Sequence, residues 1–158
     1  MSFKNIRLMP TPEEIKKMEP ISPELKAIKD ENDKQLKDIF TGKDNRFVVI
    51  VGPCSADDEE AVCDYMRRLN EVKKQVADKM FIVPRVYTGK PRTTGEGYKG
   101  MMHQPDPEGA PNMVEGIKAI RRMYLRVIEE TGMPLADEML YPSNLPFVED
   151  ILSYIFII

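Results

Sequence analysis

Tryptophan is absent from the 158 residues, histidine occurs once and cysteine occurs twice. Two cysteines cannot build the disulfide framework of a small secreted domain, so the sequence favours a reducing compartment. A single histidine excludes any metal site that needs a pair of histidines. No apolar run approaches the roughly 20 residues of a membrane span, and the first residues lack the apolar segment of a signal peptide. These absences predict a cytoplasmic protein with no membrane partner.

An excess of charge of one sign is also missing, because 23 Lys and Arg stand against 26 Asp and Glu, for a net charge of −3. Such a balance gives no general attraction to nucleic acid or anionic lipid, so any anion-binding site must be local. Hydrophobic residues make up 42% of the chain, which is enough for a core, and the length fits one ordinary domain. A complete (β/α)8 barrel typically needs about 250 residues, which is more than this chain has.

The first 45 residues differ from the rest, because prolines divide them into short charged segments. Thr11-Pro12 and Ser22-Pro23 each place a capping side chain before a proline suited to the first helical position, which predicts two helix starts. The second helix should end near Phe40. Its apolar stripe is thin, so we expect residues 1–45 to form an N-terminal arm that packs on a domain or on a neighbouring subunit.

From residue 46 to residue 158 the pattern alternates between strand and helix, which is typical of a parallel sheet with right-handed crossovers. We expect strands at 47–51, 81–87 and 135–140, a helix from the capping segment 55–58 to about 76, helices at 114–128 and 146–154, a loop at 88–112, and the start of a fourth strand at 155–158.

Polar residues follow the expected strands, and in parallel α/β folds the reactive groups gather at these carboxyl ends. Cys54 lies just after the first strand, near a helix start that would favour its thiolate. On spacing alone, a small buried cysteine in a turn is the better interpretation, and Cys63 should lie in the core. Arg85 shares one face of its strand with Val83 and Tyr87. It could pair with an internal carboxylate such as Glu138, or it could bind an anion; the pattern leaves both open.

The loop after the second strand is rich in glycine and basic residues. Lys90, Arg92 and Lys99, with the hydroxyls and glycine amides between them, could surround a phosphate, although such loops are often solvated turns. It lacks the residue order of a P-loop. We expect His103 to be a surface loop residue. On the third strand, alternation lets only one of Asp137 and Glu138 point toward the site.

Together these motifs resemble class I 3-deoxy-D-arabino-heptulosonate-7-phosphate (DAHP) synthase. The resemblance rests on Gly52-Pro-Cys-Ser55 after a hydrophobic strand, on the specific run from Arg85-Val-Tyr to Lys90-Pro-Arg-Thr-Thr94, and on Gly97-Tyr-Lys-Gly100. It extends from about residue 46 to residue 154. It implies a (β/α)8 barrel and a condensation of phosphoenolpyruvate with erythrose 4-phosphate, which opens aromatic amino-acid synthesis through the shikimate pathway. A divalent metal ion (manganese, iron, cobalt or zinc) would polarise the aldehyde oxygen.

The resemblance also implies roles for individual residues. Cys54 matches a metal ligand, and Arg85 matches an arginine that holds phosphoenolpyruvate. Lys90, Arg92 and Thr93 match a loop that binds both phosphorylated substrates, chiefly erythrose 4-phosphate; Arg85 and Lys90 would be the catalytic pair. The remaining members of the implied substrate site are Lys99 and Glu138. The family is homo-oligomeric, and its N-terminal arm commonly takes part in feedback control.

The chain departs from the family in length. It contains about three and a half βα units, so we expect the N-terminal part of a (β/α)8 barrel, cut short and inactive alone. Two alternatives remain open: a non-catalytic fragment that binds phosphate, and a regulatory or assembly half-barrel that binds a full-length subunit. An apolar strand at residues 155–158 would leave an unpaired edge.

Overall fold

A computed structural model describes residues 8–92 and 95–157. Its centre is a curled sheet of four parallel strands in the order β1-β2-β3-β4. The strands are β1 (Phe47–Val51), β2 (Met80–Val86), β3 (Ala136–Met139) and β4 (Tyr154–Ile157). The fold is therefore α/β with the parallel sheet that the alternating pattern predicted, and this half-barrel agrees with the partial (β/α)8 barrel that the family resemblance implied.

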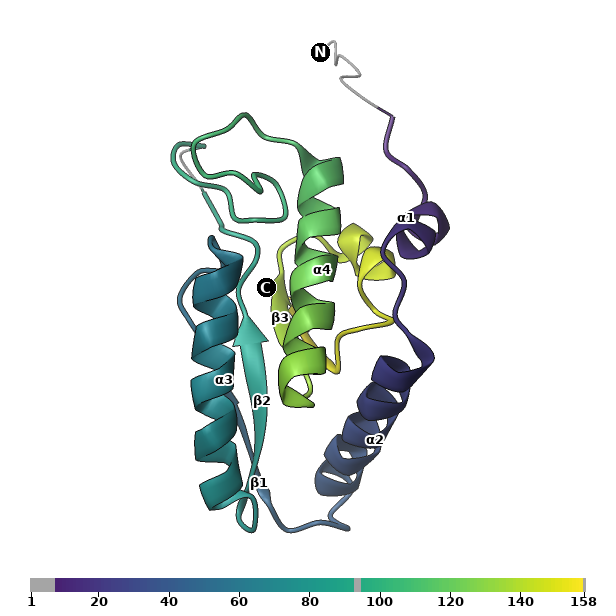
Figure 1. Cartoon of the computed structure of the whole chain (residues 1–158), viewed down its shortest axis with the longest axis vertical. Coiled ribbons are helices and arrows are strands. Elements are labelled where there is room, and N and C mark those ends of the chain that lie inside the picture. Colours follow the sequence, from purple (N-terminus) through teal and green to yellow (C-terminus); the bar gives the residue numbers. More distant parts are fainter. Residues whose placement is uncertain (1–7, 93–94, 158) are drawn as a thin grey trace.

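Two amphipathic helices cover the outer face of this sheet, α3 (Glu59–Val76) and α4 (Met113–Thr131). Figure 1 shows both running alongside β2, with the long loop between β2 and α4 at the end of the molecule where the strands finish. Asp58 caps α3 through the backbone N–H of Ala61, within the capping segment that the sequence predicts. Gly132 ends α4 with a φ of 64°, a left-handed conformation that favours glycine.

The outer core lies between the helices and the sheet, and most of its members are fully buried. Cys63 belongs to it with 1% exposure, so its expected place in the core is confirmed, and burial raises the pKa of its thiol to about 11. The opposite face of the sheet carries a smaller apolar cluster that includes Phe81 and Val83. Leu36 of α2 (Pro23–Phe40) is buried against that cluster, so the end of α2 covers part of it.

The two predicted helix starts in the arm are confirmed. Thr11 caps α1 (Pro12–Met18) in a capping box with Glu14, and Ser22 caps α2. α1 buries Ile15 completely in the core of the same chain, and it contacts α4 and η1, a 3-10 helix (Pro142–Phe147). The boundary of the arm at residue 45 stays a prediction, and residues 1–7 lie outside the described part.

The helix expected at 146–154 is wrong. This stretch contains the end of η1, a turn, and the first residue of β4. Leu135 O accepts hydrogen bonds from both Ser153 N and Tyr154 N, which draws the end of this stretch into the sheet instead of a helix. The expected fourth strand is confirmed as far as the described residues reach. Among the described residues, no helix is long and apolar enough to cross a membrane.

Candidate functional site

The carboxyl ends of β1 and β2 approach each other closely at Gly52. A Cβ atom at this position would lie 1.7 Å from the backbone oxygen of Arg85, so only glycine permits the approach. As a result Pro53 O, just beyond β1, lies within reach of the Arg85 side chain. The site thus begins where the chain leaves β1.

Arg85 forms the centre of the first cluster. Its Nη1 donates to a carboxylate oxygen of Glu138 on β3, and its Nη2 donates to Pro53 O at 2.9 Å. The guanidinium also lies 5.0 Å from the ring centroid of Tyr87. Both side chains of the ion pair are about one fifth exposed. The ion-pair interpretation of Arg85 is therefore confirmed, while anion binding stays a prediction.

Lys90, which lies in the basic loop after β2, contacts the same cluster around Arg85 through Cys54 and Tyr87. Its Nζ donates to Cys54 O, lies 3.8 Å from Cys54 Sγ and stands 4.1 Å from the Tyr87 ring centroid. Burial, and then the negative charge of Glu138, raises the pKa of Tyr87, so this phenol stays neutral at pH 7. The structure thus brings together four of the residues singled out in the sequence: Cys54, Arg85, Lys90 and Glu138. A cavity of about 470 Å³ lies beside Arg85 and Glu138.

A second cavity, of about 430 Å³, lies under the loop. Its lining includes three cationic side chains, and none of the described residues around it is acidic. Those residues are Lys90, Pro91, Arg92, Gly95, Lys99, His103, Leu140 and Tyr141. Arg92 is oriented by a 2.8 Å hydrogen bond from its Nε to Tyr98 O. This cavity can therefore attract an anion. Thr93, the remaining predicted member of the loop, lies outside the described residues.

His103 is not the surface residue expected from its loop position. It is partly buried in the second cavity, where its ring meets Tyr141 edge-on with 6.0 Å between centroids. Burial lowers its pKa, so the imidazole is neutral at pH 7. The sequence around His103 gives no signal of this burial, because its packing partner, Tyr141, comes from the segment after β3.

Cys54 is exposed, so the interpretation of a buried turn cysteine is wrong. A metal ion needs more than this thiol, since three or four protein ligands usually hold a transition metal. Among the described residues, no group of three or more His, Cys, Asp or Glu side chains could hold one. The described part of the chain does not fit a complete metal site, and Cys54 stays a predicted single ligand.

The two acidic residues of β3 point in opposite directions, as alternation requires. Glu138 faces Arg85, whereas Asp137 is buried toward α4, where Thr88 and Tyr124 bind its carboxylate. The sequence analysis missed this buried group. The signals that could have found it are a tyrosine on the apolar stripe of α4 and a threonine just after a buried strand.

Comparison with known proteins gives consistent results. A sequence model of the DAHP synthetase I family matches residues 20–157. The chain is 34% identical over 148 residues to the Tyr-sensitive phospho-2-dehydro-3-deoxyheptonate aldolase of Escherichia coli strain K12, with 94% of this chain and 41% of the relative covered. It is 39% identical over 117 residues to the phospho-2-dehydro-3-deoxyheptonate aldolase of Amycolatopsis methanolica, with 74% of this chain and 57% of the relative covered.

A solved structure shows the same fold. The phospho-2-dehydro-3-deoxyheptonate aldolase of Francisella tularensis SCHU S4 superposes with a TM-score of 0.87 at 27% identity, covering 98% of this chain and 45% of that one. The chain therefore spans about two fifths of the length of the Escherichia coli relative and less than half of this structural neighbour.

Proposed function

The chain belongs to the DAHP synthetase I family, and we propose that it carries the part of a 3-deoxy-7-phosphoheptulonate synthase site that binds phosphoenolpyruvate and erythrose 4-phosphate. The relatives named above are enzymes of this type. The observation that carries the proposal is the meeting of Arg85 and Lys90 over the Tyr87 ring, at the carboxyl ends of β1 and β2. Because the chain spans only part of these relatives, the substrates and the condensation are proposals.

In this proposal Arg85 holds phosphoenolpyruvate. A planar guanidinium suits a carboxylate or phosphate, and the contacts to Pro53 O and Glu138 hold it in one orientation before the ligand arrives. Glu138 also offsets part of the positive charge, so the anion competes with an internal carboxylate. Lys90 lies within the same cluster, and as a point charge it can contact either substrate.

Erythrose 4-phosphate takes the second cavity. Arg92 and Lys99 line it beside Lys90, and none of the described lining residues is a carboxylate that would repel a phosphate group. Thr93 is assigned to the same subsite through the family resemblance alone. The two substrates would then meet at Lys90, the residue common to both groups of contacts.

Cys54 is proposed as one thiolate ligand of a divalent metal ion. The described residues do not complete that site, so no step of the reaction is assigned to the metal. On the family resemblance, a cytoplasmic homo-oligomer is proposed as well.

Binding measurements on the purified chain test the proposal. Phosphoenolpyruvate and erythrose 4-phosphate should each bind weakly, in the millimolar range. Arg85→Ala should weaken phosphoenolpyruvate about tenfold or more, because a charge-assisted hydrogen bond contributes roughly 1.5–3 kcal/mol, while erythrose 4-phosphate should change little. Arg92→Ala should do the reverse. The matched control is Arg68→Ala, since Arg68 is an exposed arginine on α3 that pairs with Asp64 of the same helix.

Two outcomes would decide against the proposal: neither substrate binds to the wild-type chain, or Arg85→Ala and Arg92→Ala bind both substrates as tightly as the wild type. The purified chain should form no product even with added manganese, because the described residues do not complete a metal site; product above a no-enzyme control would contradict the expectation that the chain is inactive alone.

A further inference from the structure

The loop that carries Lys90, Arg92 and Lys99 is held at its base by Thr88. Thr88 is fully buried, and all its polar groups have partners: its N and Oγ1 donate to Asp137, and its carbonyl accepts from Met102 N at 3.2 Å. Gly100 lies against the same carbonyl, which would be 2.2 Å from a Cβ atom there. Thr88 therefore joins the start of the loop to residues 100–102, just after the basic residues.

Asp137 is the partner that holds Thr88. Its carboxylate is 1% exposed and accepts four hydrogen bonds, from Thr88 N at 3.2 Å, Glu138 N at 2.7 Å, Thr88 Oγ1 and Tyr124 OH. Since none of these donors is charged, no cation offsets the buried carboxylate through them. Burial of a carboxylate without a cationic partner costs folding free energy, so the presence of Asp137 here indicates a role that an apolar residue could not fill.

The sheet itself explains why an acceptor is needed here. The hydrogen-bonded ladder between β2 and β3 ends at the pairing of Val86 with Asp137. Beyond that pair, Thr88 N still faces β3 and has no strand acceptor, and an unpaired buried N–H is unfavourable. The Asp137 side chain supplies the acceptor and continues the ladder by about one step. It thereby sets where the chain turns into the loop.

We propose that Asp137 is a positioning residue for the anion site: one carboxylate fixes the start of the cationic loop and the backbone of Glu138 in the same geometry. The proposal rests on the proposed function, because it assigns this geometry to the binding of phosphorylated substrates. Lys90 follows Thr88 by two residues, and its N donates to Lys99 O at 3.2 Å, so a shift of Thr88 moves both lysines. Glu138 is the next residue after Asp137 and holds Arg85.

The test compares four variants of the full chain. Asp137→Asn removes the charge and one acceptor at nearly constant volume, and Thr88→Val removes the hydroxyl donor. Thr88→Ser keeps that hydroxyl and is the rescue variant. Ile128→Val is the control, because it trims a buried side chain of α4 away from the loop. The first readout, which needs no ligand, is amide hydrogen exchange at Lys90 and Met102. The second is the affinity for phosphoenolpyruvate.

Asp137→Asn and Thr88→Val should exchange at least tenfold faster at both amides and lose at least fivefold in phosphoenolpyruvate affinity. Thr88→Ser and Ile128→Val should stay within twofold of the wild type in both readouts. Unchanged exchange in Asp137→Asn would overturn the positioning role, and so would faster exchange with unchanged affinity. If exchange responds as expected but the wild type binds no phosphoenolpyruvate, the proposed function fails and the tethering of the loop stands.

Discussion

The two neighbouring carboxylates on β3 lie in very different environments, because successive side chains of a strand point to opposite faces of the sheet. Glu138 is partly exposed and forms an ion pair with Arg85, whereas Asp137 is buried and accepts hydrogen bonds from uncharged donors. Burial raises the pKa of Asp137 from 3.8 to about 6, against the opposing effect of its hydrogen bonds from Thr88 and Tyr124. The same burial raises the pKa of Tyr124 far above its ordinary range, with the charge of Asp137 as a second cause.

A stability measurement against pH tests this environment. Because the folded chain holds the Asp137 proton more tightly than the unfolded chain does, the contribution of this group is fully present below pH 3.8 and is lost as pH rises through about 6. Between pH 4 and pH 7 the wild type should therefore lose roughly 2 kcal/mol of unfolding free energy relative to Asp137→Asn. Urea denaturation of both proteins across that range measures the difference. A constant difference would contradict the raised pKa.

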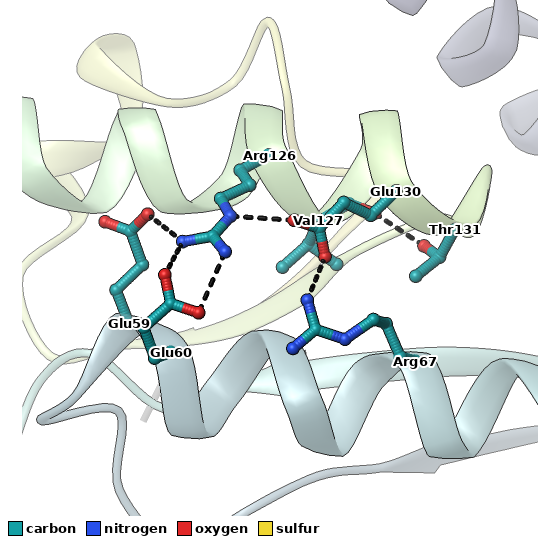
Figure 2. Close-up of polar contacts among 7 residues, drawn as sticks. All are labelled: Glu59, Glu60, Arg67, Arg126, Val127, Glu130 and Thr131. Carbon is teal, nitrogen blue, oxygen red and sulfur yellow. Dashed lines mark hydrogen bonds and ion pairs between the residues drawn. The ribbon is translucent and has the colours of Figure 1, made fainter.

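At the scale of elements, a group of charged side chains joins the two outer helices. Figure 2 shows Arg126 reaching from α4 to the first turn of α3, where it donates to Glu59 at 2.9 Å and to both carboxylate oxygens of Glu60. Its Nε donates to Glu130 at 2.8 Å, and Arg67 of α3 donates to the same carboxylate at 2.8 Å. Hydrogen bonds from Arg126 lower the pKa values of Glu60 and Glu130, so this group supports the α3–α4 packing at neutral pH.

Replacement of Arg126 by methionine should keep the packing of the aliphatic part of the side chain and remove its hydrogen bonds to Glu59, Glu60 and Glu130. We expect the thermal midpoint at pH 7 to fall by about 2–3 °C, and by less in 1 M salt, since the group lies at the surface. Because the pKa of Glu60 is lowered from 4.5 in the folded chain, the contribution of this ion pair to the unfolding free energy is present above pH 4.5 and is lost as the pH falls below it. The difference between wild type and variant should thus shrink in acid.

Arg68→Met is the matched control for this prediction, because Arg68 pairs with Asp64 of its own helix and its side chain is 80% exposed. Its thermal midpoint should stay unchanged. An equal fall in the two variants would mean that the bonds between the helices contribute nothing.

Across the whole molecule, one buried arginine ties the arm to the half-barrel. Arg121 of α4 is fully buried and donates to Glu19 O, just after α1, to Phe147 O at the end of η1, and to both carboxylate oxygens of Asp150. Segments more than a hundred residues apart in the sequence thus meet on one guanidinium. In Figure 1, α1 and the yellow coils of the C-terminal part lie beside α4.

Removal of this guanidinium should release the arm. Arg121→Met leaves the carbonyls and Asp150 without their donor, so we expect a loss of about 3 kcal/mol in unfolding free energy. Limited proteolysis of residues 12–40 should become at least fivefold faster. The adjacent Arg122 is half exposed and makes one ion pair, with Glu19, so Arg122→Met should cost less than about 1 kcal/mol and leave proteolysis unchanged. Equal effects of the two substitutions would refute the role of Arg121.

The sequence by itself determined the order of the strands and outer helices, their parallel arrangement, and the positions of Cys54, Arg85 and Lys90 after strand ends. These properties depend on local periodicity, caps and short connections, which neighbouring residues decide. It also determined that Asp137 and Glu138 face opposite sides, because alternation is a property of any strand.

Only the tertiary structure decided which of the two acids meets Arg85, that Tyr124 and Thr88 converge on the other, and that His103 lies in a cavity. The turn and strand found at 148–154, where a helix was expected, also depended on contacts with Leu135 far back in the chain. Each of these outcomes follows from the register between strands or the placement of α4 on the sheet. Both are set by packing among residues tens of positions apart, and no local pattern encodes that.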